Sequence, residues 1–425
     1  MVIINGMSNP GAAKQRILFL TTVRSYRLDA FRAAAERLGV EVATAVDLPE
    51  GLGDQWPGAL PLSFSDTGEA ARKIAAFAAL HPLSAVLAVD DSGALVAAAA
   101  SDLLGLPHND PAAAEAARDK AVMRRMLKAG CVPVPWFREY TTADDPAAVA
   151  AEAPYPCVVK PVNLNGSRGV IRADNPEALQ AAIARLTRIV TAETAEPRPY
   201  LIESYLPGVE VALEGMLDNG RLTVLALFDK PDPLEGPFFE ETIYVTPSRL
   251  PAATQAAVEE TTAAAARALG LVSGPVHAEL RVNDDGVWLI EIAGRSIGGL
   301  CSQVLRFGVD ASLEELIVRQ AAGLPLGNTT RRDRAAGVMM IPIPEAGLLR
   351  EVSGVEEAAA VPLIENVEIT ARLNYPLVPL PEGDSYLGFI FARGDTPEAV
   401  ESALRQAHSR LGFRIDTLLP VLSVQ

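Results

Sequence analysis

The sequence is poor in the residues that most metal and redox sites require. It has 3 cysteines, at positions 131, 157 and 301, and none of them forms a C-x-x-C pair. It also has only 4 histidines, which argues against a site built from several imidazoles. Cysteines this few and this far apart indicate a reducing compartment and no zinc site of the usual kind. We therefore expect a cytoplasmic protein.

Several other signatures are missing. No G-x-G-x-x-G follows the first predicted strand and no lysine precedes Ser or Thr, so a dinucleotide fingerprint and a Walker A loop are both absent. A net charge of -16 argues against nucleic acid or an anionic membrane as partner. The most apolar region, residues 80–106, is broken by Pro and Asp, so it predicts a buried strand and helix instead of a membrane span. No targeting segment stands out.

The length and the order of patterns predict several domains. A chain of 425 residues with 49% hydrophobic residues can build two to four cores. After a loose leader at residues 1–15, short β-favouring runs at 16–23, 40–46 and 85–89 alternate with helical patterns. Such alternation predicts a Rossmann-like parallel α/β domain over residues 1–112.

The remaining chain has a less regular order of strands and helices, typical of an α+β fold. We expect two further units over residues 113–198 and 199–327 and a smaller α+β unit over 328–425. The predicted fold class is therefore α/β at the N-terminus followed by α+β.

Residues 275–299, PVHAELRVNDDGVWLIEIAGRSIGG, read as two strands joined by a tight turn. Apolar and polar residues alternate with a period of two on both sides of the turn. A three-residue loop, Asp284 to Gly286, places glycine at the left-handed position. This register sets Glu279 opposite Glu291, with their Cβ atoms roughly 5 Å apart.

Two facing carboxylates need an explanation. Like charges directly opposed on a sheet are destabilising unless a positive group lies between them. The simplest such group is a divalent cation bound through carboxylate oxygens, such as Mg²⁺. The alternative is that Glu279 and Glu291 are two solvated side chains on an exposed face.

Lys160 lies in the otherwise apolar run VVKPV, although the chain has only six lysines among its 37 basic residues. It precedes NLNGSRG, in which Gly166 and Gly169 allow close backbone approach and amides that cradle phosphate oxygens. The alternative is an edge-strand lysine with a solvated head. Glu203 and Glu210 flank a Pro-Gly turn, where they could meet a purine and a ribose, or be ordinary surface glutamates.

Taken in chain order, these pieces resemble a known superfamily. Lys120, Lys160 with its glycine loop, the run Glu203-Ser-Tyr-Leu206 followed by Glu210, and the segment HAEL…LIEIAGRSIGG resemble the ATP-grasp superfamily. The last segment is most similar to carboxylate–amine ligases of the L-amino-acid ligase type. The resemblance covers residues 111–323 and implies an ATP-grasp fold between the two flanking domains.

The resemblance also implies roles for individual residues. The nucleotide would be ATP and the metal Mg²⁺, with Mn²⁺ as an alternative. His277 is expected to contact substrate or to be a plain hydrogen-bonded sheet histidine. The other implied roles are these: Lys120 and Lys160 at the ATP phosphates or the adenine side, Gly166, Ser167 and Gly169 in a flexible lid, Glu203 and Leu206 at adenine, Glu210 at ribose, Glu279 and Glu291 at the metal, and Arg295 at the charge of the acyl-phosphate and the tetrahedral intermediate.

The implied activity joins a small-molecule carboxylate to an amine. ATP would convert the carboxylate to an acyl-phosphate, and the amine would then displace phosphate. Ala293 departs from the family, because many ATP-grasp enzymes carry a metal-binding Asn at that position. Two alternatives stay open: an ATP-grasp enzyme of the purine-pathway ligase or carboxylase type, and a nucleotide-binding module without turnover. Symmetry statistics favour a homodimer.

Overall fold

The computed structural model describes residues 15–417, apart from 24, 50, 53–55, 193, 195 and 333. The expected leader at residues 1–15 therefore lies outside the described residues, except for Gln15. The chain folds into two compact units: Met1–His108 with Glu314–Gly327, and Asn109–Leu313 with Asn328–Gln425. Within the described ranges we find no helix that is both long and apolar enough to cross a bilayer.

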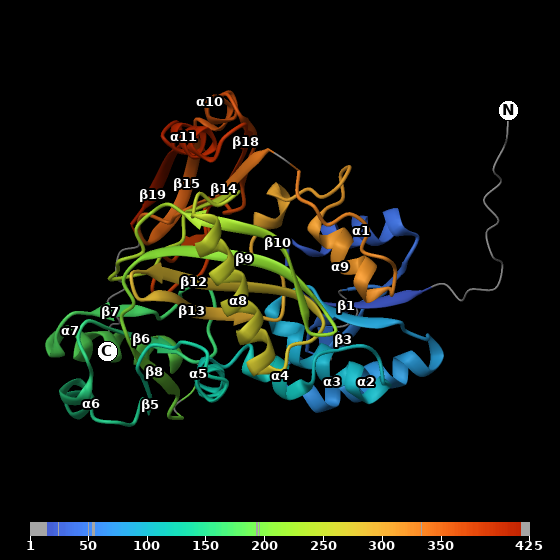
Figure 1. Cartoon of the computed structure of the whole chain (residues 1–425), viewed down its shortest axis with the longest axis horizontal. Helices are drawn as coiled ribbons and strands as arrows, with labels where there is room; N and C mark the ends of the chain where they lie inside the picture. Colours follow the sequence, from blue (N-terminus) through green and yellow to red (C-terminus); the bar gives the residue numbers. More distant parts are fainter. Residues whose placement is uncertain are drawn as a thin grey trace. The chain divides into compact units, whose positions relative to one another are not determined.

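The first unit is built on a parallel sheet with the strand order β3-β2-β1-β4 (Figure 1). Leu18 and Leu20 of β1 pack with residues of α2 and α3, whereas Phe19 contacts Phe31 of α1 edge to face. The alternation of strands and helices predicted for this region is confirmed. Its elements are β1 (Arg16–Thr22), α1 (Leu28–Leu38), β2 (Glu41–Asp47), β3 (Leu60–Leu62), α2 (Thr67–Leu80), β4 (Ala85–Ala88) and α3 (Ala94–Leu104), and α9 (Leu313–Ala321) falls largely within this unit.

The second unit contains a four-stranded antiparallel sheet of order β5-β8-β6-β7. Leu179, Ile183 and Leu186 form the buried stripe of α7 and pack against Val159 and Ile202 of the sheet. The elements of this region are α4 (Pro111–Ala116), α5 (Lys120–Ala129), β5 (Phe137–Thr141), α6 (Pro146–Glu152), β6 (Cys157–Pro161), β7 (Ile171–Ala173), α7 (Pro176–Val190) and β8 (Pro199–Ser204).

A large eight-stranded sheet of order β13-β12-β9-β10-β11-β14-β18-β16 follows. Helix α8 covers one face of it, with Val258, Ala265 and Leu269 packed against Leu213 and Leu280 (Figure 1). Its strands are β9 (Val209–Asp218), β10 (Arg221–Lys230), β11 (Ile243–Thr246), β12 (Gly274–Asn283), β13 (Gly286–Ala293), β14 (Ala335–Ile341), β16 (Ile364–Ile369) and β18 (Gly388–Gly394), and α8 spans Ala252–Leu269.

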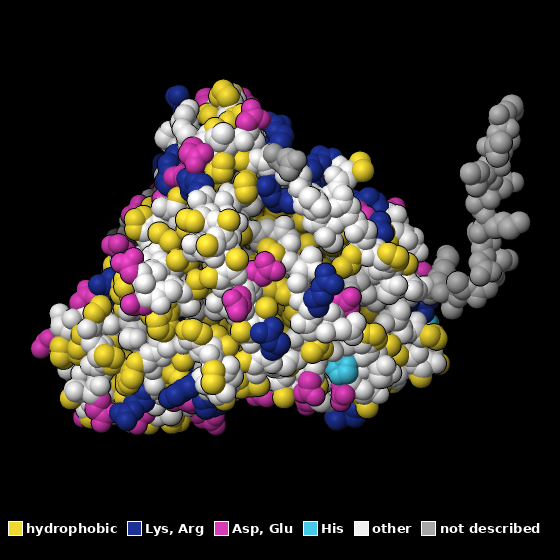
Figure 2. All heavy atoms as spheres, viewed as in Figure 1, with side chains coloured by type: hydrophobic (Ala, Val, Ile, Leu, Met, Phe, Trp, Pro, Cys, Tyr) yellow, Lys and Arg dark blue, Asp and Glu magenta, His cyan; other side chains and the backbone are white. Residues whose placement is uncertain are grey.

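The C-terminal region contributes to this sheet and also forms one of its own. Strands β14, β18 and β16 extend the large sheet, because β14 pairs with β11. The other elements are β15 (Gly347–Ser353), α10 (Val355–Ala359), β17 (Pro376–Leu377), α11 (Pro397–His408) and β19 (Gly412–Asp416), of which β17, β15 and β19 make a three-stranded sheet. The domain boundaries placed at 112, 198 and 327 stay a prediction. On the face drawn in Figure 2, Lys and Arg side chains are interspersed with Asp and Glu.

The hairpin formed by β12 and β13 pairs Glu279 with Glu291, as the sequence predicted. The loop length that was expected to produce this register is wrong. Asn283 pairs with Gly286, so the loop has two residues instead of three. A β-bulge then leaves Ile290 as an extra residue between the pairs. The bulge compensates for the shorter loop and returns the two glutamates to the same register.

The bulge also changes which side chains of β13 are buried. Strict alternation placed Leu289 on the same face as Glu291. Leu289 instead lies in the core with Ile292 and Leu280, all 0% exposed. In a regular strand, residues three apart point to opposite faces. Leu289 and Ile292 both point into the core because the extra residue of the bulge shifts the alternation between them by one position.

Candidate active site

Strand β12 presents a stripe of four polar side chains, His277, Glu279, Arg281 and Asn283. They share one face because they are two residues apart. The intervening Leu280 is 0% exposed and points into the core beneath α8. The alternation of one strand therefore separates the core from a polar surface, and each residue of that surface has a partner on another element.

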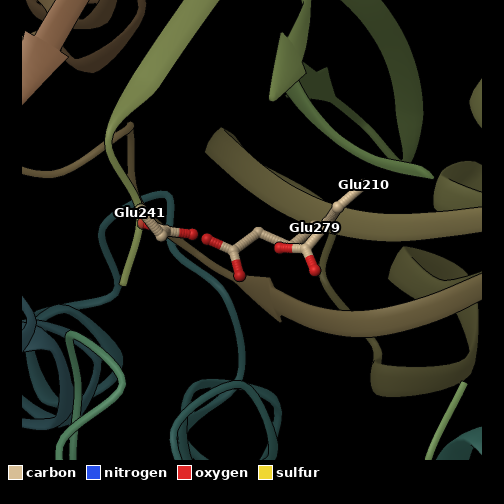
Figure 3. A group of neighbouring side chains, drawn as sticks. All are labelled: Glu210, Glu241 and Glu279. Atoms are coloured by element: carbon tan, nitrogen blue, oxygen red, sulfur yellow. The ribbon is translucent and has the colours of Figure 1, made fainter. Parts of the chain in front are cut away.

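The centre of the site is a group of three carboxylates around one ammonium. Oxygen atoms of Glu210, Glu241 and Glu279 all lie within 4.8 Å of one another. Lys230 Nζ lies 2.8 Å from Glu210 Oε1 and 3.4 Å from Glu279 Oε1, and it also bonds Glu241. Figure 3 shows the Glu241 and Glu279 carboxylates turned toward each other. Three acids and one lysine leave this group with excess negative charge.

A proton on Glu241 reduces this excess negative charge by one. Burial, together with the Glu279 carboxylate, raises the pKa of Glu241 to about 7 against the opposing effect of Lys230. Burial also disfavours the charge of Glu279, but Lys230 and His277 hold its pKa well below the ordinary range. Lys230 keeps its charge because the carboxylates outweigh burial and raise its pKa. Near neutral pH Glu241 therefore exchanges a proton while Glu279 stays ionised.

His277 lies between two carboxylates and is buried. Its Nδ1 is 3.1 Å from Glu214 Oε2, and its Nε2 is 3.5 Å from Glu279 Oε1. Burial alone would lower the pKa of His277, but hydrogen bonds to both acids raise it to about 9. Glu214 is 0% exposed and also accepts the Ile297 N–H at 3.0 Å. His277 is thus a charged histidine that fixes the position of Glu279.

Glu291 is paired with a different lysine. Lys120 Nζ lies 3.3 Å from Glu291 and donates to the Leu164 carbonyl at 2.9 Å. Lys120 is 7% exposed and starts helix α5. The facing glutamates therefore each have a buried ammonium, Lys120 on Glu291 and Lys230 on Glu279. Whether Glu279 and Glu291 hold a metal stays a prediction.

Lys160 and Glu203 form a buried ion pair with Arg124. Glu203 Oε2 lies 2.5 Å from Lys160 Nζ, and Oε1 lies 2.7 Å from Arg124 Nε. Burial would raise the pKa of Glu203, but the two cations hold it at about 2. Burial lowers the pKa of Lys160, which Glu203 opposes. The alternatives of a solvated lysine and a surface glutamate are wrong, because Lys160 is 6% and Glu203 3% exposed.

The turn after Glu203 carries the predicted adenine and ribose contacts. The Leu206 carbonyl accepts a hydrogen bond from Arg281 Nη1 at 2.7 Å. Glu210 accepts from Arg281 Nε at 2.9 Å as well as from Lys230. The structure thus brings Glu210 into the carboxylate group, where it lies beside Glu279. Its contact with ribose stays a prediction.

The glycine loop between β6 and β7 is folded against a segment of the C-terminal region. Gly166, Ser167 and Gly169 have positive φ angles of 60°, 55° and 73°. The Gly169 N–H donates to the Pro381 carbonyl at 2.8 Å, and Arg168 Nε donates to the Glu382 carbonyl at 2.9 Å. The predicted lid therefore has a docking surface, and its opening over phosphates stays a prediction.

Arg295 and Ala293 follow the second glutamate. Arg295 is partly buried, and its Nη1 donates to the Ser296 carbonyl at 3.0 Å. Ala293 is 5% exposed and pairs with His277 across the hairpin. Ala293, which offers no ligand atom, thus lies beside His277. The catalytic role of Arg295 stays a prediction.

Sequence reasoning missed several residues of this site, among them Lys230, Glu241, Arg124 and Glu214. Lys230 shared the signal that identified Lys160, since it is one of only six lysines. Glu241 had no local signal, because its partners lie on other strands. Arg124 looked like a surface residue of an amphipathic helix, although it is 1% exposed. Glu214 lies in an apolar run, where alternation alone does not show which face of the strand its side chain occupies.

Comparison with known families finds three matches along the chain. Residues 153–304 match the ATP-grasp domain, residues 31–108 the ATP-grasp N-terminal domain, and residues 339–416 the L-amino acid ligase C-terminal domain 2. The chain therefore carries ATP-grasp domains, and its C-terminal match is to a domain of the L-amino acid ligases.

Individual relatives have modest identity. The chain is 26% identical over 310 residues to the uncharacterized protein y4rH of Sinorhizobium fredii, covering 73% of this chain and 64% of that protein. It is 29% identical to the alanine–anticapsin ligase of Bacillus subtilis over 54% of this chain and 53% of that one. The crystal structure of L-amino acid ligase from Bacillus licheniformis superposes with a TM-score of 0.77 and 26% identity, covering 95% of this chain and 100% of that chain. The chain thus spans between about half and two thirds of the length of the y4rH protein and of the alanine–anticapsin ligase.

Proposed function

We propose that this protein is an ATP-dependent carboxylate–amine ligase that forms an amide or peptide bond, with amino acids as the substrate class. The observation that carries the proposal is the facing pair Glu279 and Glu291, each held by its own buried lysine. A site that transfers a phosphoryl group needs fixed cations and carboxylates more than a protein nucleophile. A cytoplasmic location is part of this proposal.

The proposed reaction has two steps. An oxygen of the substrate carboxylate attacks the γ-phosphorus of ATP, the bond to the β–γ bridging oxygen breaks, and ADP leaves. The amine nitrogen then attacks the acyl carbon, the carbon–oxygen bond to phosphate breaks, and the nitrogen releases a proton. Lys120, Lys160 and Lys230 are the ammonium groups that neutralise phosphate charge. Glu241, with a pKa of about 7, is a group that can accept a proton at neutral pH.

The residues present fit a divalent cation. Glu279 and Glu291 share one face of the hairpin, and Glu210 and Glu241 place further carboxylate oxygens beside Glu279. Oxygen ligands of this kind suit Mg²⁺ or Mn²⁺. We assign the cation to Glu279 and Glu291, where it would supply neutralisation of the phosphate oxygens. Ala293 offers no ligand atom, so further coordination would come from water or substrate oxygens.

The proposed nucleotide site also contains a buried hydrogen-bond donor without an acceptor among the described residues. Arg124 Nη1 is buried and has no hydrogen-bond partner among the described residues, whereas its Nε and Nη2 bond Glu203 and the Ile290 carbonyl. Buried guanidinium donors are normally satisfied. An acceptor on a ligand bound near the Lys160–Glu203 pair would satisfy it, which supports nucleotide binding there.

The test is ADP release from ATP and Mg²⁺ against a panel of amino-acid pairs. We expect ADP only when both a carboxylate and an amine are present, with a dipeptide detected by mass spectrometry. Hydroxylamine in place of the amine should give a hydroxamate, which traps the acyl-phosphate. Tight ATP binding without turnover on any pair would favour the non-catalytic module. Turnover that requires bicarbonate or a purine precursor would favour the other ATP-grasp branch.

A further inference from the structure

We infer that Arg281 is a positioning residue for the adenosine-binding end of the site. The inference rests on the proposed function for the assignment of the turn at Leu206 to adenine. Arg281 follows Glu279 by two residues on β12, so the strand that supplies a carboxylate to the phosphate end also supplies this guanidinium. No role for it came from the sequence, where it is one of many arginines.

The first observation is that Arg281 uses its donors on three separate elements. Nη1 donates to the Leu206 carbonyl at 2.7 Å, Nε donates to Glu210 at 2.9 Å, and Nη2 donates to the Leu234 carbonyl. Arg281 is only 3% exposed. A planar guanidinium with fixed donors holds such partners in a defined arrangement, which an ammonium cannot do.

The second observation is the chemistry of the turn that Arg281 holds. Leu206 precedes a proline, so the peptide between them has no N–H and its carbonyl is its only hydrogen-bonding group. Arg281 donates a hydrogen bond to the Leu206 carbonyl, and Asn283 Nδ2 donates one to the following carbonyl, that of Pro207, at 3.1 Å. Two alternate residues of β12 thus fix two successive carbonyls of the turn.

The third observation is close backbone approach. A Cβ atom added to Gly208 would lie 2.2 Å from the Val282 carbonyl oxygen, and Gly208 has a φ of 119°. The turn is therefore pressed directly against β12 between the residues that hold it. It has no freedom to move without breaking the bonds to Arg281 and Asn283.

The fourth observation is that the same guanidinium lies among aromatic rings. Arg281 lies 5.2 Å from the Tyr205 ring centroid and 5.8 Å from that of Phe239, and the two rings stack at 6.4 Å. Arg172 lies over Tyr205 at 4.1 Å. Tyr205 is thus in contact with guanidinium groups from β7 and β12. Arg281 thereby fixes the turn and the segment carrying Phe239 together.

These contacts define what Arg281 should do and what it should not do. It bonds the turn at Leu206 and the proposed ribose acceptor Glu210. Its loss should therefore weaken binding of the adenosine part of ATP. Binding of a bare polyphosphate, which has neither base nor ribose, should not change.

The experiment compares Arg281→Lys with the wild-type full chain by calorimetric titration with Mg-ATP and with Mg-tripolyphosphate. Arg221→Lys is the matched control, since Arg221 is an exposed arginine at the start of strand β10 in the same sheet. We expect Arg281→Lys to weaken ATP binding roughly tenfold or more, as expected for loss of a bond to a charged donor. Tripolyphosphate affinity should stay within twofold.

The outcomes separate positioning from general destabilisation. Unchanged ATP affinity in a folded Arg281→Lys chain would overturn the inference, and so would equal weakening of both ligands. Asn283→Ala, at a partly buried position, provides a second variant if Arg281→Lys does not fold, and it should weaken ATP binding severalfold. An unaffected Asn283→Ala would then overturn it. Binding needs no turnover, so a wild-type chain that binds ATP but forms no amide would refute the ligase and not this role.

Discussion

The buried ion pair of Glu203 offers a sharp energetic test. We consider Glu203→Gln, which removes the charge but keeps the shape. Lys160 and Arg124 would lose the carboxylate that lies 2.5 Å and 2.7 Å from their nitrogens. Both cations are almost fully buried, so water cannot replace it. The expected result is a less stable second unit, since two charges are left without a partner.

The magnitude can be worked out in two ways. A carboxyl pKa lowered from 4.5 to about 2 corresponds to ~3 kcal/mol of stability at neutral pH. Breaking a buried ion pair by removal of one partner costs about 3–5 kcal/mol. Both routes give a loss of about 3 kcal/mol for Glu203→Gln.

The pH dependence follows from the sign of the shift. The folded pKa of Glu203 is below its unfolded value, so the stabilisation is fully present above pH 4.5 and is lost as the pH falls through about 2. The difference between wild type and variant should therefore be constant near neutrality. It should shrink in acid below pH 4.5.

Urea unfolding followed by tryptophan fluorescence measures this loss. Trp136 is a local probe, because its carbonyl accepts the Ser204 N–H at 2.9 Å, next to Glu203. The control is Glu139→Gln, whose ion pair with Arg125 is exposed and should contribute less than about 1 kcal/mol. If Glu203→Gln costs no more than this control, the reasoning about buried charge is refuted.

The remaining predictions concern turnover. Glu291→Gln should abolish amine-dependent ADP release while the chain stays folded, because the charge facing Glu279 is lost. A fully active variant would remove the metal assignment. Lys230→Met should lower ADP release at saturating ATP by roughly a hundredfold or more, since three carboxylates lose their cation; retained activity would exclude the role in phosphate neutralisation. Glu382→Gln should raise amine-independent ATP hydrolysis by up to about tenfold, because it weakens the ion pair with Arg185 at 2.6 Å and with it the docking of the glycine loop. Hydrolysis that matches a Glu351→Gln control, at an exposed pair elsewhere in the C-terminal region, would contradict this account.

Local patterns predicted those parts of the fold whose signals lie within a few residues. The sequence pattern of residues 252–269 predicts a helix, and α8 has these bounds, because Pro251 precedes its start and Gly270 takes the left-handed conformation at its end. The run Asp218-Asn219-Gly220 between two apolar stretches predicts the β9–β10 hairpin, and Asn219 and Gly220 both adopt the positive φ angles that such a turn requires. The parallel sheet of the first unit followed from alternation alone.

The candidate site was predictable only in part. The pairing of Glu279 with Glu291 lies within one hairpin, so the sequence could reach it even through a wrong loop length. Lys230 ends strand β10 and Glu241 lies two residues before strand β11, and their approach to Glu279 depends on a strand order that no local pattern contains. Arg124 was missed because arginine is rarely buried without a visible partner in the sequence.

The eight-stranded sheet has a consequence for how this chain can be divided. Strand β11 has β10 on one side and β14 on the other, and β14 begins beyond residue 327. A chain shortened at that point would leave backbone amides and carbonyls of β11 without their partners, on an edge able to recruit strands from other molecules. A chimera that takes residues 328–425 from a relative would therefore have to preserve the pairing register of β14 with β11.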